Sequence, residues 1–123
     1  MSITPTFAPN ISMYDGSVAQ WTWALTTAVP DGLPIEWTEW ADRTTQATGT
    51  FGGATCAIEG SNDGTNWFTL SNAAGATAAT FTAAGVKTII ELPRYMRPNL
   101  TVVGVGATIT VILVARRANP LRT

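Results

Sequence analysis

The side chains that most often transfer protons or bind metal ions are almost missing from this sequence. It contains no His and a single Cys, Cys56, which lies in an alternating stretch typical of a strand. A nucleophilic Ser, Thr or Cys needs a neighbouring base, and Ser-His or Cys-His pairs require a His. Zinc sites need clusters of Cys and His. We therefore expect Cys56 to be a small buried apolar residue, and we expect no catalytic residue, cofactor or metal.

One pair of carboxylates has a spacing that invites a catalytic interpretation. Glu36 and Glu39 lie three residues apart and are flanked by Trp37 and Trp40. Two carboxyl groups at a separation of roughly 5 to 9 Å hydrolyse glycosidic bonds, and the Trp residues resemble a sugar-binding lip. The same residues fit an exposed acidic loop whose Trp side chains anchor it to the core. We favour the loop.

The segment Asn62–Asn66 offers a second set of oxygen atoms. Its side chains surround Gly64 and resemble a calcium loop, but the regular acidic series and the distal Glu of such a loop are missing. Asn and Asp tolerate left-handed backbone, and a Gly completes a tight hairpin. We therefore interpret this segment as a turn.

The composition favours a component of an assembly over an enzyme. Charged residues make up 12% of the chain and hydrophobic residues 46%, whereas an ordinary soluble domain is roughly 25% charged. A surface of Thr, Asn, Ser and Gly protects poorly against association. The net charge is −1, so we expect neither nucleic acid nor membrane as a partner. The N-terminal residues have neither the basic start nor the apolar run of a secretory signal.

The charges are divided between the two halves of the chain. Seven acidic residues and one basic residue precede position 64, and six basic residues and one acidic residue follow position 86. Either acidic and basic strands pair within one sheet, or an acidic face of one subunit meets a basic face of the next.

Alternating residues predict a series of short strands. In the stretch 19–25, Trp21, Trp23 and Leu25 share one face of a half-buried strand. Ile109, Val111, Leu113 and Ala115 share one face of a strand that we expect to be central or covered on both sides. We expect further strands within residues 44–51, 55–59, 67–70, 80–82, 87–92 and 95–103, a helical turn or a bulged strand at 35–42, and a flexible connection at 71–79.

About eight strands with turn signals every ten or so residues predict an all-β protein. We expect a single-domain β-sandwich of antiparallel strands, with a jelly roll as the preferred architecture. Residues 1–16 form an extended N-terminal arm in this prediction, residues 17–118 the sandwich domain, and residues 119–123 a C-terminal tail.

Five residues are the candidates for a protein interface. Trp37 and Trp40 lie in an irregular segment, and Trp is enriched at interface centres. Tyr14 belongs to the predicted arm, and Arg94 and Arg97 belong to the basic half of the chain.

Two sequence segments carry a family resemblance. Residues 58–70 have the sequence IEGSNDGTNWFTL, and residues 93–98 have the sequence PRYMRP. Their spacing resembles small structural proteins of tailed bacteriophages, particularly capsid decoration or cement proteins with a jelly-roll core. The resemblance covers roughly residues 44–116. The same segments resemble discoidin-like carbohydrate- or lipid-binding modules, which are longer and often closed by disulfides.

The phage resemblance implies a non-enzymatic virion protein. It implies a homo-oligomer, dimer or trimer, on the outside of a capsid, with the major capsid protein as its partner, made in the host cytoplasm. The alternative is a carbohydrate-binding β-sandwich module of a phage tail or receptor-binding structure.

Overall fold

The computed structural model describes residues 2–8, 18–36 and 40–117, with only the backbone of residues 40, 41 and 117. In this part of the chain every regular element is a β-strand, which confirms the predicted all-β class. The strands are β1 (Thr6–Ala8), β2 (Val18–Thr26), β3 (Ile35–Glu36), β4 (Trp40–Thr50), β5 (Thr55–Ser61), β6 (Phe68–Thr69), β7 (Ser71–Asn72), β8 (Thr77–Ala78), β9 (Thr80–Phe81), β10 (Gly85–Thr88), β11 (Tyr95–Val102) and β12 (Thr108–Arg117).

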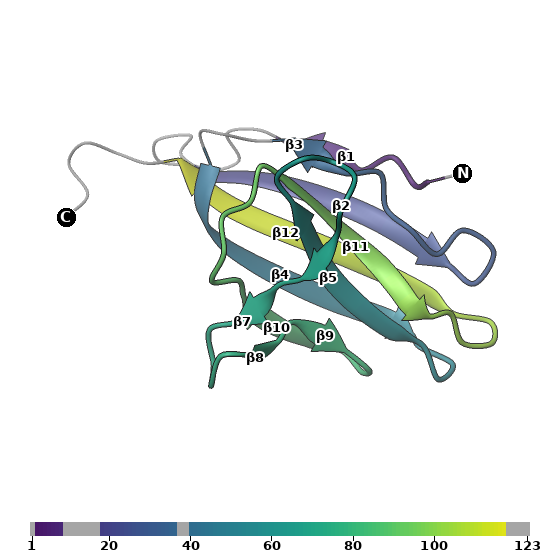
Figure 1. Cartoon of the computed structure of the whole chain (residues 1–123). Coiled ribbons are helices and arrows are strands. Elements are labelled where there is room, and N and C mark those ends of the chain that lie inside the picture. The colour runs from purple at the N-terminus through teal and green to yellow at the C-terminus, as the bar shows by residue number, and fades with distance from the viewer. Residues whose placement is uncertain (1, 9–17, 37–39, 118–123) are drawn as a thin grey trace.

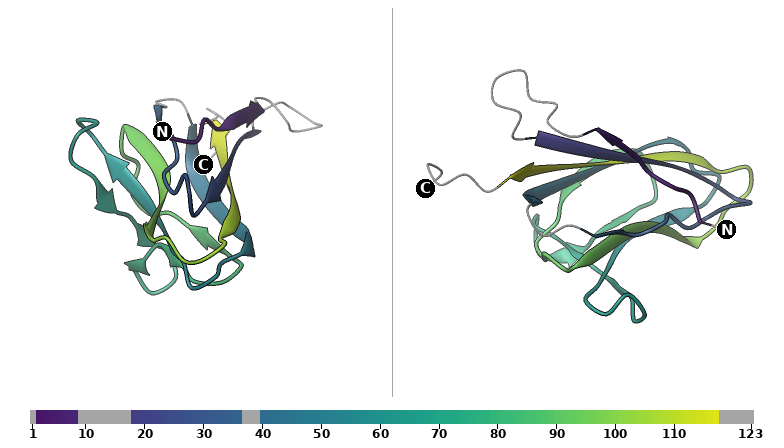
Figure 2. Two further views of the ribbon diagram at one scale, coloured as in Figure 1. Left: turned by 90° about the vertical axis from the view of Figure 1, so that its right-hand side faces the viewer. Right: turned by 90° about the horizontal axis from the view of Figure 1, so that it is seen from above.

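Two antiparallel sheets form the two layers of a sandwich (Figures 1 and 2). The first sheet has the strand order β1-β2-β12-β4-β10. The second has the order β3-β11-β5-β6, and β9 also pairs with β5. The short strands β7 and β8 pair with each other apart from both sheets.

The core lies between the two sheets and takes side chains from both. The first sheet contributes Trp23 and Leu113, and the second contributes Ile58 and Met96, all at most 2% exposed. These four residues line one small apolar space between the layers. Apolar burial of this kind supplies most of the stability of a domain that has no disulfide.

β12 is the central strand of the first sheet, as the sequence predicts. It pairs along its length with β2 on one side and β4 on the other. Ile109, Val111, Leu113 and Ala115 are at most 1% exposed. The residues between them are half-buried or exposed on the outer surface of the sheet, so only one face of β12 lies in the core.

The N-terminal segment is part of the domain over residues 2–8. β1 pairs with the edge of β2, and the Phe7 ring stacks on Trp21 with 4.9 Å between ring centroids. Ser2 donates a hydrogen bond to Asp31 over 2.5 Å, and the Leu33 amide donates to Ile3. This part of the predicted arm is extended as expected, but it lies on the sandwich and does not project from it.

Two local predictions are wrong. The residues 71–79, expected as a flexible connection, form the β7–β8 hairpin. Asn72 and Ala79 within it are buried, at 8% and 0% exposed, and the Ala79 amide donates to the Leu70 carbonyl. The strand expected at 87–92 ends at Thr88. One of the two alternatives for residues 35–42, the bulged strand, is confirmed within the described residues. β4 bulges at Asp42 and Arg43, where its pairing with β12 passes from Ala41–Arg116 to Thr44–Val114, and Asp42 has a φ of 48°.

We expect Leu113→Ala to lower the free energy of unfolding by about 3 kcal/mol, because it leaves a cavity between the sheets. The measurement is equilibrium unfolding in guanidinium chloride. Val105→Ala is the matched control, since Val105 is 86% exposed, and it should change stability by less than about 0.5 kcal/mol. Equal effects of the two substitutions would contradict this account of the core.

Candidate interface

The structure describes the side chains of two of the five predicted interface residues. Tyr14 and Trp37 lie outside the described residues, as does the side chain of Trp40 at the start of β4. Arg94 and Arg97 both lie at the start of β11, which pairs with β3 and β5 in the second sheet. Arg97 belongs to β11, and Arg94 directly precedes it.

Arg97 belongs to a closely packed cluster on the outer side of the second sheet. Its Nε donates to Glu59 Oε1 over 3.0 Å, and its guanidinium lies over the Trp67 ring, 4.2 Å from the centroid. Asn99 Nδ2 donates to the other carboxylate oxygen of Glu59 over 3.4 Å. Glu59 is 8% exposed. Arg97 therefore serves to hold Trp67 and the β5–β6 connection against β11.

Arg94 is more exposed and pairs with an acid from the first half of the chain. Its Nε donates to Glu36 Oε2, and its guanidinium lies 5.0 Å from the centroid of the Tyr95 ring. Both ion pairs thus join strands of the same sheet, β3 with β11 and β5 with β11. At these two positions the acidic and basic halves meet within the sheet, the first of the two interpretations above.

The Asn62–Asn66 segment is a turn closed by its own hydrogen bonds. The Asp63 carboxylate accepts bonds from Ser61 Oγ, the Thr65 amide, and the amide and side chain of Asn66, over 2.7 to 2.8 Å. Gly64 has a φ of 76°, which favours Gly. The bonds from Asn66, then those from Thr65 and Ser61, hold the pKa of Asp63 well below its usual range. These observations confirm the interpretation as a turn.

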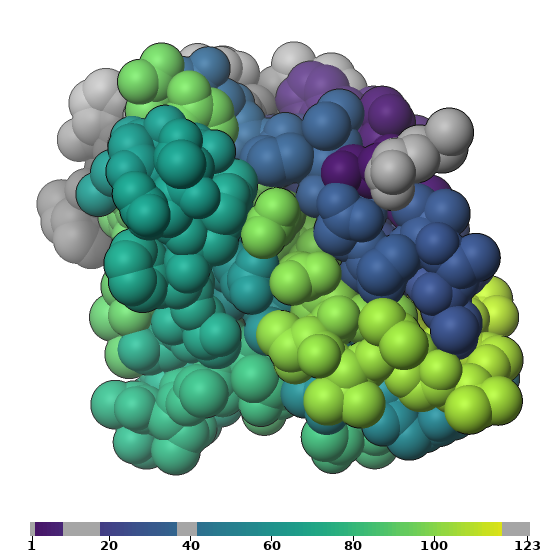
Figure 3. Space-filling model, turned by 45° about the vertical axis from the view of Figure 1, so that its right-hand side comes forward, coloured from purple at the N-terminus to yellow at the C-terminus, as the bar shows by residue number. Residues whose placement is uncertain are grey.

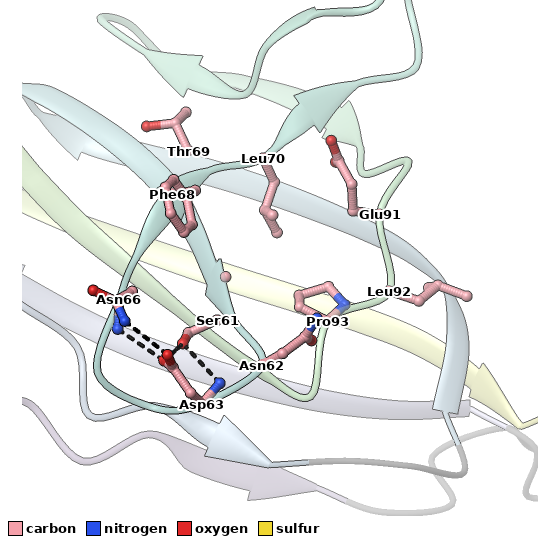
Figure 4. A pocket seen from close by; sticks show the side chains of 11 residues that line it. Ser61, Asn62, Asp63, Asn66, Phe68, Thr69, Leu70, Glu91, Leu92 and Pro93 are labelled. Atoms are coloured by element: carbon pink, nitrogen blue, oxygen red, sulfur yellow. Dashed lines mark hydrogen bonds between the residues drawn. The ribbon is translucent and has the colours of Figure 1, made fainter.

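This turn forms one wall of a surface hollow of about 450 Å³ (Figure 4). Phe68 and Leu70 on one side and Pro93 on the other point toward the same space, while Leu92 extends away from it. The Arg94 amide donates to Asn62 Oδ1 over 3.0 Å and so joins the two walls. Figure 3 shows the segment around residues 60–70 beside the residues that follow position 90, as one continuous surface.

The rim of this hollow carries large apolar side chains that are open to solvent. Phe68 is 69% exposed and Leu92 60% exposed. Leu92 also borders a second hollow of about 600 Å³. Ile90 lines this second hollow and is 50% exposed. We call Phe68, Ile90 and Leu92 the apolar rim. Grouped apolar side chains in the open mark a contact surface more often than single ones do.

A buried arginine supports the segment that carries the rim. Arg43 is 2% exposed, and its Nη1 donates to the Pro93 carbonyl over 3.4 Å and to Met96 Sδ over 2.9 Å. The Ile89 amide donates to the Arg43 carbonyl over 3.0 Å. Burial lowers the pKa of Arg43 to about 9, so the side chain stays charged at neutral pH. Through these hydrogen bonds Arg43 joins residues 89–96 to β4.

Cys56 and Glu36, two of the residues considered for catalysis, line neither hollow. Cys56 is fully buried in β5, as expected. Glu36 is engaged by Arg94, and Glu39 lies outside the described residues. Within residues 2–8, 18–36 and 40–117, no three His, Cys, Asp or Glu side chains gather as a metal ion would require. The same residues form no helix with the length and apolar character to cross a membrane.

We expect the Cys56 thiol to be unreactive in the folded protein. Burial raises its pKa to about 12, the nearby Glu59 charge adds to this, and a hydrogen bond with the Asn99 backbone opposes it. Because the thiolate is the reactive form, labelling by a disulfide reagent at pH 8 should be roughly a thousandfold slower than in 6 M guanidinium chloride. Equal rates in the two conditions would show an accessible thiol.

We expect Asp63→Asn to lower the melting temperature at pH 7. The pKa of this carboxyl is lower in the folded than in the unfolded chain, so its ionised form stabilises the fold above about pH 4. That contribution is lost as the pH falls below this value. The melting temperatures of the two proteins, measured from pH 7 to pH 2, should therefore converge at acidic pH. A difference that is independent of pH would contradict this role of Asp63.

Comparisons with protein-family models, with curated proteins and with solved structures gave no match to this chain.

Proposed function

We propose that this chain is a structural virion protein that binds and stabilises the outside of a phage capsid through protein–protein contacts. Its partner is the major capsid protein at the junctions between subunits. The observation that carries this proposal is the apolar rim, which places Phe68, Ile90 and Leu92 in the open around two hollows.

The rim has the chemistry of a protein contact site. Apolar and aromatic side chains that fill pockets on a partner supply most of the energy of an interface. The hollows beside the rim can receive side chains of the partner in return. The second hollow is bordered by an acid, Asp42, and a base, Arg116, as well as by Ile90 and Leu92. Polar groups beside apolar ones are typical of protein interfaces.

Stabilisation of a shell needs no catalysis. A protein that binds the assembled shell and not its free subunits stabilises the shell by mass action. The low charge content of the chain suits a protein that works in contact with others, since few ions must lose water on binding. The resemblance of residues 58–70 and 93–98 to decoration proteins, stated above, agrees with this role.

The strand order supports the jelly-roll interpretation. The strands β2, β3, β4 and β5 alternate between the first and second sheets, and β10, β11 and β12 alternate again. The layers therefore contain the orders β2-β12-β4-β10 and β3-β11-β5-β6. Jelly rolls have eight strands in two Greek keys and occur in viral capsid proteins and in lectins.

The test is co-sedimentation with empty shells assembled from the major capsid protein encoded with this chain. We expect the protein to sediment with the shells, and we expect Phe68→Ser to weaken binding by roughly tenfold or more. Phe68 is exposed in the free protein, so the substitution should leave the melting temperature nearly unchanged.

Val105→Ser is the matched control for this experiment. Val105 is 86% exposed in the loop between β11 and β12, at the end of β11 away from the rim. It should bind shells as the unchanged protein does. Failure of the unchanged protein to bind shells, or equal binding by the Phe68→Ser variant, would refute the proposal.

A carbohydrate-binding module is the second candidate, and one observation favours it. The exposed Phe68 ring and the side-chain amides of Asn62 and Asn66 line the same hollow. Aromatic faces and amides are groups that bind sugars. A glycan array decides between the two candidates. Binding that Phe68→Ala abolishes would favour the module, and the absence of binding to any glycan would remove it.

A further inference from the structure

The outer surface of the first sheet is lined by threonine and by small or apolar side chains. Antiparallel neighbours point to the same side of a sheet, so the strand register and the burial pattern identify these residues. We call this surface the outer threonine face. In rows across the strands it consists of Thr26, Thr108 and Thr50; Ala24, Thr110 and Thr48; Thr6, Thr22, Ile112, Gln46 and Val86; Ala8, Gln20, Val114, Thr44 and Thr88; and Val18 with Arg116.

Charge is almost excluded from this face. Among the described residues, its first four rows contain no Asp, Glu, Lys or Arg, and Arg116 lies in the last row. The exposed Asp42 lies beside the last two rows, where it lines a hollow with Thr44, Thr88 and Arg116. Lys87 of β10 pairs with the buried Thr45 and lies over the Phe81 ring, and so points to the opposite side. The outer side of the second sheet, by contrast, carries the Arg97–Glu59 pair, beside the exposed Arg94–Glu36 pair. Depletion of charge at the centre is the compositional mark of an interface.

We propose that the outer threonine face is the surface through which two copies of this chain pair, sheet against sheet. This pairing does not require binding to a capsid, so it stands or falls independently of the proposed function. Its chemistry is that of a dry, uncharged contact between two pleated surfaces, like the packing of sheets within a sandwich.

The size of the face fits a modest dimer. Strands lie about 4.8 Å apart, and alternate residues along a strand about 6.8 Å apart. With three long strands and two short ones, the face covers roughly 550 Å² on each copy, or roughly 1,100 Å² in total. A specific interface should exceed about 1,000 Å². The expected dimer is therefore dependent on concentration and not permanent.

The face is also suited to meet a copy of itself. β12 is the third of five strands, and Ile112 lies in the third of five rows. A two-fold axis that lies in the plane between the two facing sheets and passes over Ile112 therefore places this residue opposite its equivalent in the second copy, as an isologous interface requires. Because the first four rows carry no charge, the centres of two copies meet without repulsion between like charges. Thr hydroxyl groups donate and accept, so each pairs with an identical group.

The experiment is sedimentation velocity of the full chain between about 1 and 200 μM. We expect the mass to rise from one chain to two across this range. Ile112→Lys brings two ammonium groups together at the centre, and it should weaken pairing more than about 30-fold. Gln46→Lys changes an exposed position of the same row and should also weaken pairing. It is the second variant because Ile112 is half-buried and its replacement by Lys can disturb folding. Mixing Ile112→Lys with Ile112→Glu should restore pairing as a mixed dimer.

Thr101→Lys is the matched control, because Thr101 is exposed on β11 of the other sheet. It should pair as the unchanged chain does. A chain that stays single at all concentrations would overturn the proposal, as would a dimer that tolerates both Ile112→Lys and Gln46→Lys. If the chain stays monomeric while Gln46→Lys prevents binding to shells, the outer threonine face binds the capsid protein and not a second copy, and the proposal is also wrong.

Discussion

The register of β12 between β2 and β4 is the constraint on which the rest of the structure depends. Side chains alternate along a strand, so one register sends Ile109, Val111 and Leu113 into the core and leaves Thr110 and Ile112 outside. A shift by one residue would exchange the two sets and expose the core. The same pairing that builds the core therefore also builds the uncharged outer face, and neither is free to change without the other.

The two surfaces proposed for binding have different origins in the fold. The outer threonine face follows from strand alternation alone, because the strands of one sheet form it. The apolar rim depends on connections between strands. The Asp63 turn, the bond from the Arg94 amide to Asn62 and the buried Arg43 hold the two walls of the hollow together. The two surfaces meet at the second hollow, which Thr44, Thr88 and Arg116 of the outer threonine face line together with Ile90 and Leu92 of the apolar rim.

The sequence predicts the long strands well because their periodicity is local. Trp21, Trp23 and Leu25 alternate with the smaller Thr22 and Ala24, and the structure buries all three large residues. The Asp63 turn was also predictable, since Asn, Asp and Gly act on their own backbone. The β7–β8 hairpin was not predictable from its small, repetitive residues. The hairpin is held in place by hydrogen bonds to residues distant in sequence. One example is the bond that the Ser71 amide donates to Glu91 Oε1 over 2.7 Å.

The candidate site was harder to predict, since exposure depends on tertiary contacts. Phe68 and Leu92 are residue types that usually lie in the core, and only the fold shows that their side chains are exposed to solvent. Glu59 and Trp67 engage Arg97 within the chain, and its role in an interface stays a prediction.

The most direct test of an adhesive role is an electron cryomicroscopy reconstruction of shells saturated with the protein. The account predicts that Phe68 and Leu92 are buried against the capsid protein and that Ile112 faces a second copy. A bound protein with both surfaces open to solvent, attached instead through the outer side of the second sheet, would contradict it.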